Sequence, residues 1–189
     1  PLGVEEGFDE AQTGASFFGS VYPRSNVLTY TLYSKFLPAL DGDSTTANYS
    51  TGGRLEYSNT LGTWSVGTSF LASRRNGIGW TYLGGLDGVW RWKGLEVTAE
   101  ALYSNGEYDL HRFWDVYLMG VYEIRKSFYV VARYEHYDPL GVVASFDIGD
   151  FGLGWTPWPF LNVKAGYRVS NREAEQVTRG FTASISFLF

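Results

Sequence analysis

Residues 177–189 read Val-Thr-Arg-Gly-Phe-Thr-Ala-Ser-Ile-Ser-Phe-Leu-Phe, and this stretch carries the pattern that decides the fold. Apolar side chains alternate with hydroxyl-bearing ones from Phe181 to Phe187. Successive side chains of a β-strand point to opposite faces, so the stretch separates its apolar groups from its Thr and Ser groups. The sequence therefore predicts a strand with one apolar and one polar face.

The composition suits a chain built from such strands. Aromatic residues make up 18% of the 189 residues, and 23 residues are glycine. No apolar run approaches the ~18 residues that a membrane helix needs, and the mean hydropathy is −0.16. The net charge of −5 argues against a nucleic-acid-binding surface, and the absence of cysteine excludes disulfides and thiolate metal sites.

Turn-forming residues divide the chain into paired strands. Short connections are expected near 23–24, 61–62, 93–94, 125–126 and 156–157. Longer polar connections are expected at 37–48, 73–77, 105–111, 138–143 and 171–176. Short connections at one end and long ones at the other are typical of membrane barrels, whereas a soluble meander need not keep this order.

The period of two recurs along the chain, with one change of parity. Phe146 and Ile148 give way to Phe151, Leu153 and Trp155 as the apolar positions. A β-bulge inserts one extra residue and shifts the alternation by one position. The sequence therefore predicts a bulge near residues 149–150.

The polar faces carry charged residues, which are the candidate functional residues. Aromatic side chains cluster at both ends of the strands around an aliphatic middle, as the two interfaces of a bilayer favour. A small barrel also has no room inside for most of the seven Trp. The charged face is therefore expected to line the lumen. The lumen-lining candidates are Arg54, Glu56, Asp87, Arg91, Glu96, Glu100, Asp115, Glu123, Arg133, Glu135, Lys164 and Arg168.

This pattern resembles that of Gram-negative outer-membrane β-barrels over nearly the whole chain. The terminal stretch resembles their C-terminal assembly signal through Phe181, Ile185, Phe187 and Phe189. The resemblance implies an all-β, antiparallel, up-and-down transmembrane β-barrel in the outer membrane of a Gram-negative bacterium. It implies as partners the lipid bilayer, lipopolysaccharide and the outer-membrane insertion machinery. No cofactor, metal or nucleic acid is expected.

The strand count leaves two interpretations open. Ten strands are expected within 27–189, and an eleventh candidate at 15–22 alternates poorly because Phe17 and Phe18 are adjacent. Complete bacterial barrels normally have an even number of strands. Either 1–26 is a lead segment before a ten-stranded barrel, or it holds an outer loop and a first strand of a larger barrel. The first residue is proline rather than methionine, so a processed chain or a fragment is expected.

The charged face supports two functions. In a water-filled lumen, acids on one part of the wall and bases on another create a transverse field for small hydrophilic solutes, as in porins. Passive diffusion of such solutes is what the resemblance implies. In a narrow barrel the same groups would pair into a network that closes the interior, because buried charges need partners. The protein would then be a non-conducting barrel that anchors or assembles with envelope partners.

A surface protease is the third hypothesis. Asp41 and Asp43 in one long connection, with Asp109 and His111 in another, are similar to the water-activating groups of the omptin proteases. Nothing else in the chain resembles these ten-stranded barrels, so no enzymatic activity is expected. His136 falls on the apolar face near the long connections, where an interfacial role is expected.

Overall fold

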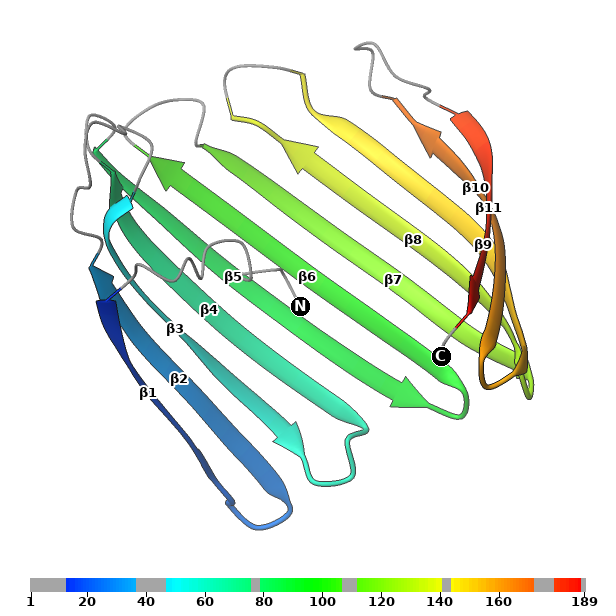
Figure 1. The fold of residues 1–189 in the computed structure, drawn as a ribbon, viewed down its shortest axis with the longest axis horizontal. Helices are drawn as coiled ribbons and strands as arrows, with labels where there is room; N and C mark the ends of the chain where they lie inside the picture. The colour runs from blue at the N-terminus through cyan, green and yellow to red at the C-terminus, as the bar shows by residue number, and fades with distance from the viewer. Residues whose placement is uncertain are drawn as a thin grey trace.

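The computed structural model describes residues 13–36, 47–75, 79–106, 112–140, 144–171 and 179–187. These residues form eleven antiparallel strands in one sheet, and each strand pairs with the next in the sequence (Figure 1). No helix in these ranges is long and apolar enough to cross a membrane. The strands are β1 (Thr13–Val21), β2 (Asn26–Phe36), β3 (Ala47–Asn59), β4 (Trp64–Arg75), β5 (Gly79–Trp92), β6 (Leu95–Gly106), β7 (Phe113–Arg125), β8 (Phe128–Asp138), β9 (Phe146–Trp158), β10 (Leu161–Ser170) and β11 (Arg179–Phe187).

The sheet is strongly curved, and its strands run obliquely across it (Figure 1). β1 and β11 are its two edges, and within the described residues they do not pair with each other. The all-β, antiparallel, up-and-down fold is therefore confirmed, as a curved sheet that is open between its first and last strands.

The eleventh strand is present at the start of the sheet. β1 pairs with β2 at every one of its residues, with Phe17 opposite Leu32 and Phe18 opposite Thr31. The two adjacent phenylalanines thus lie on different faces, which explains the poor alternation. Residues 1–12 lie outside the described ranges, so a division of the chain at residue 26 stays a prediction.

The predicted bulge near residues 149–150 is wrong. The pairing of β8 with β9 runs without interruption from Tyr137–Phe146 to Phe128–Trp155. Phe146 therefore lies on the polar face, where its ring centroid is 5.1 Å from that of Tyr137. Tyr137 in turn lies 5.5 Å from Phe113, so three strands contribute to an aromatic column on this face.

The irregularity lies nearer the end of β9. Leu161 of β10 pairs with Trp158, but Val163 pairs with Trp155, so β9 has one residue more than β10 over this interval. Pro157 lies within it, and proline has no N–H to contribute to a ladder. The short turn expected at 156–157 is accordingly displaced to residues 159–160.

Exposure shows which face is concave. On β6, Leu102 is 8% exposed and Ser104 only 3%, although both lie on the face that carries the charges. Tyr103 between them points to the apolar face and is 47% exposed. Side chains crowd together on the inside of a curved sheet and spread apart on the outside. The charged face is therefore concave and the apolar face convex.

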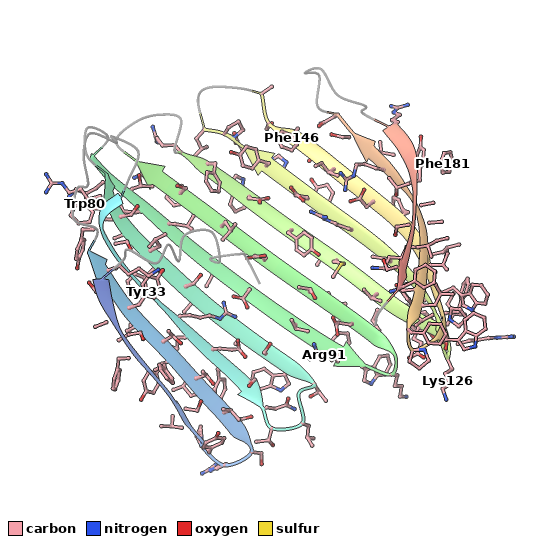
Figure 2. All side chains as sticks on the ribbon, viewed as in Figure 1. Tyr33, Trp80, Arg91, Lys126, Phe146 and Phe181 are labelled. Carbon is pink, nitrogen blue, oxygen red and sulfur yellow. The ribbon has the colours of Figure 1, made fainter. Side chains whose placement is uncertain are left out.

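The convex face exposes large apolar side chains throughout. Phe181 is 89% exposed, Leu86 is also largely exposed, and Trp155 is half exposed. Figure 2 labels Trp80 on β5 and Phe181 on the edge strand β11 at opposite sides of the view, and the Phe181 side chain projects away from the concave side. Monomeric soluble proteins rarely expose so continuous an apolar surface, because its contact with water is unfavourable. A bilayer removes that penalty, so the convex face is the membrane-facing one.

Candidate functional site

The strand register places all twelve predicted charged residues on the concave face. Asp87 pairs with Glu100 and Arg91 with Glu96 across β5 and β6. The ladders from β2 to β9 are regular along most of their length, so the period of two carries from strand to strand. The site is thus a wall of ionic groups rather than a compact pocket.

One ionic cluster spans β3 to β5. Arg54 Nη1 lies 2.5 Å from Asp87 Oδ1, and Arg54 Nη2 lies 2.8 Å from Asp87 Oδ2. The same Nη2 donates to Glu56 Oε2 at 3.0 Å. Two parallel N–H···O bonds between a guanidinium and a carboxylate make a strong and directional pair.

Gly67 makes this bridge possible. It lies on β4, between Glu56 on β3 and Asp87 on β5. A Cβ at this position would lie 2.7 Å from Arg54 Nη2 and 2.8 Å from Asp87 Oδ1. The absence of a side chain on β4 therefore lets two charged groups from next-but-one strands meet above it.

A second ionic cluster spans β8 to β10. Arg168 donates from Nε to Asp150 Oδ1 at 2.7 Å and from Nη2 to Asp150 Oδ2 at 3.0 Å. Arg133 pairs with Glu135 on its own strand, and its Nη1 lies 3.9 Å from Asp150 Oδ2. The Arg133 guanidinium also lies over the ring of Tyr117, 4.9 Å from its centroid, in a cation–π contact.

Asp150 is a candidate functional residue that sequence reasoning missed. It joins two of the predicted cations, Arg133 and Arg168, but the supposed bulge removed it from the polar face. The signal was present in the sequence: Asp150 alternates with Phe151, Leu153 and Trp155 without a break.

A solved structure with the same fold is the anion-selective porin from Comamonas acidovorans. It superposes on this chain with a TM-score of 0.64 at 11% sequence identity, over 86% of this chain and 54% of the porin. The chain has the fold of a porin-like outer-membrane β-barrel. It spans about half the length of that porin.

The other comparisons add nothing to this result. A structure titled "Unveiling the Mechanism Behind the in-meso Crystallization of Membrane Proteins" superposes with a TM-score of 0.49 at 10% identity, over 93% of this chain and 79% of that one. At that score the similarity carries no argument. No family model matches the chain, and no curated protein sequence matches it.

In this porin-like sheet the ion pairs run along the wall. Each ion pair between described Arg, Asp and Glu residues joins groups on one strand, on neighbouring strands or across a single intervening strand. The paired Arg, Asp and Glu side chains are 18% to 51% exposed. Glu100, Glu123 and Lys164 form no ion pair with another described residue.

The remaining predicted positions divide into two groups. Phe181, Ile185 and Phe187 lie on the convex face, because they pair with Tyr167, Val163 and Leu161 of β10. His136 also lies on the convex face, as expected. Phe189 and the four residues of the protease hypothesis, Asp41, Asp43, Asp109 and His111, lie outside the described residues.

Proposed function

We propose that this chain forms the wall of an outer-membrane channel for passive diffusion of small hydrophilic solutes in a Gram-negative bacterium. The observation that carries the proposal is the one-sided wall of partly exposed ionic groups on the concave face of a porin-like sheet. Charged groups with half of their surface open, such as Arg91 and Arg168, suit contact with water. The twelve predicted residues, together with Asp150, would then line the lumen.

The distribution of charge along the wall supports a transverse field. Of these thirteen residues, those on β3 to β7 comprise two basic and six acidic groups, and those on β8 to β10 comprise three basic and two acidic groups. The predominantly acidic part and the predominantly basic part of the wall adjoin where β7 pairs with β8. A polar solute between them would be oriented by the field, which salt screens over ~10 Å at 0.1 M.

A non-conducting barrel that anchors envelope partners is the second candidate. It is favoured by two buried atoms on the concave face, Asp115 Oδ1 and Arg133 Nε, which have no hydrogen-bond partner among the described residues. Their burial indicates tight packing around Arg133. A closed interior would extend such packing over the whole wall.

The membrane partners follow from the convex face. Its exposed aromatic and aliphatic side chains suit the lipid bilayer, and the short turns would face the periplasm with the long connections outside. We propose lipopolysaccharide as the lipid of the outer leaflet. The insertion machinery would read the terminal stretch that ends in Phe189.

Planar-bilayer recording with the full-length protein tests the proposed function. The channel predicts discrete conductance steps, and vesicles that contain the protein should swell in small sugars but not in large dextrans. Protein that inserts, as shown by protease protection in the same vesicles, yet never conducts would contradict the channel and support the anchoring barrel.

A further inference from the structure

The convex face of β7 to β10 contains an apolar hollow of about 640 Å³. Its floor consists of the small residues Gly120, Ala132 and Ala165. A Cβ at Gly120 would meet no atom within 4 Å, so the floor is open to the membrane side. Rings border the hollow, among them those of Tyr122, Phe151 and Phe181.

A polar cluster lies on the same face, farther along β8 and β9 toward the long connections. Asp147 Oδ1 accepts a hydrogen bond from Tyr134 Oη at 2.6 Å and lies 2.9 Å from His136 Nδ1. Asn171 Nδ2 donates to Asp147 Oδ2 at 2.8 Å. The carboxylate is thus engaged on both oxygens, and within the described residues no hydrogen bond involves His136 Nε2.

A cation lies beside this cluster on the same convex face. Arg179 is opposite Val169 on β10, and Val169 is opposite Gly149 on β9, two residues from Asp147. The Arg179 side chain is exposed, and no ion pair or hydrogen bond joins it to another described residue. This face thus presents a cation and the His136 ring together at the edge of its apolar surface.

The distance between the two features fits one leaflet of a bilayer. His136 is four residues from Ala132 along β8. At ~3.3 Å per residue this is ~13 Å along the strand, or ~9 Å along the membrane normal for a tilt of ~45°. Half of the hydrocarbon core is ~15 Å thick. A molecule with a headgroup at His136 would therefore place an acyl chain over the hollow.

We propose that the hollow and the polar cluster together bind one molecule of lipid A, the phosphorylated and acylated glucosamine disaccharide of lipopolysaccharide. An acyl chain fills the hollow over Ala132, and a phosphate is held by Arg179. The sugar hydroxyls contact His136 and the amide of Asn171. This site rests on the proposed outer-membrane location, but not on conduction.

Native mass spectrometry of the full-length protein with added lipid A tests the site. Ala132→Leu fills the hollow with a group that a membrane-facing surface tolerates, and Arg179→Gln removes the cation. Each should weaken lipid A binding about tenfold, since a charge-assisted contact or a filled cavity changes the free energy by ~1.4 kcal/mol or more. Ala99→Leu and Arg74→Gln are the matched controls, because both residues are exposed on the convex face away from the hollow.

Three binding results would overturn the site. They are equal binding by all variants, equal loss in the controls, and retention of phosphatidylglycerol as tight as that of lipid A. A change in the mass of the protein assembly on Ala132→Leu would also overturn it, because a second copy would then occupy the hollow. Planar-bilayer conductance of the same variants should equal that of the parent, which reports on the proposed function independently of lipid binding.

Discussion

On β6 the two faces of the sheet place neighbouring residues in opposite surroundings. Ala99 and Tyr103 point outward, where a bilayer would meet them, whereas Glu100 and Leu102 point into the concave side among groups from β5 and β7. In a soluble protein large apolar side chains such as Tyr103 would be buried, whereas here Tyr103 is 47% exposed. The difference indicates that lipid, rather than a protein core, covers the large apolar side chains. The concave face is organised by ion pairs and small residues.

The largest expected effect comes from placing one charge on each face of β6. Ala99→Arg puts the charge in the hydrocarbon region, where it costs ~2–4 kcal/mol near the midplane. Glu100→Arg puts it next to Asp87 and Asp115 and should cost far less. Equilibrium unfolding from lipid vesicles measures both. Equal losses of stability would show that the faces do not differ in this way.

A smaller effect is expected where the concave face depends on the absence of a side chain. Gly67→Leu would collide with both partners of the Arg54–Asp87 bridge and should destabilise the sheet by ~1–3 kcal/mol, as overpacking usually does. The control is Gly84→Leu on β5, because a Cβ there meets nothing within 4 Å. Its stability should match that of the parent. A loss of the same size in both variants would remove the special role of Gly67.

Neutralising either of two concave-face cations should shift ion selectivity in the same direction, but the effects on stability should differ. Lys164 has no ion-pair partner among the described residues, so Lys164→Gln should shift ion selectivity toward cations without loss of stability. Arg168→Gln also removes the two hydrogen bonds to Asp150 and leaves it only the longer contact with Arg133, so a similar shift should come with a small loss of stability, discounted because both groups are partly exposed. Reversal potentials at 0.1 M and 1 M salt test this, because the shift should fade as screening increases. No shift in either variant would contradict a conducting lumen.

The smallest expected effect on the folded sheet concerns the end of the chain. Deleting Phe189 should leave refolding in detergent largely unchanged, because one terminal side chain adds little to an eleven-stranded sheet. The amount inserted in cells should fall, since the resemblance implies that the insertion machinery reads this residue. Insertion at the parental level would count against the assembly signal.

The faces of the sheet were predictable from sequence because a strand has a strict period of two. Phe181, Ile185 and Phe187 needed no tertiary information to be placed on one side. The same reasoning assigned Phe146 to the wrong face. Phe146 and Ile148 are apolar residues on the polar face, and their positions looked like a change in the alternation. Phe146 is tolerated on the polar face because its ring packs against that of Tyr137.

Contacts between distant strands were beyond sequence reasoning. The Arg54–Asp87 bridge depends on the alignment of β3, β4 and β5, which places Gly67 beneath it. The bulge at Pro157 depends on where β10 pairs with β9, and a single proline does not fix that position. Alternation assigns each side chain to a face, but it does not set which residues on that face are neighbours.

The stacked indoles of Trp90 and Trp92 give the sheet an optical signature of its register. Their ring centroids are 6.1 Å apart and their planes differ by 15°. A slip of β5 by one residue would turn both rings from the membrane to the lumen side. Both chromophores would then lie in surroundings of different polarity. Near-ultraviolet circular dichroism of this pair thus distinguishes a correctly aligned sheet from one that has merely acquired β-structure.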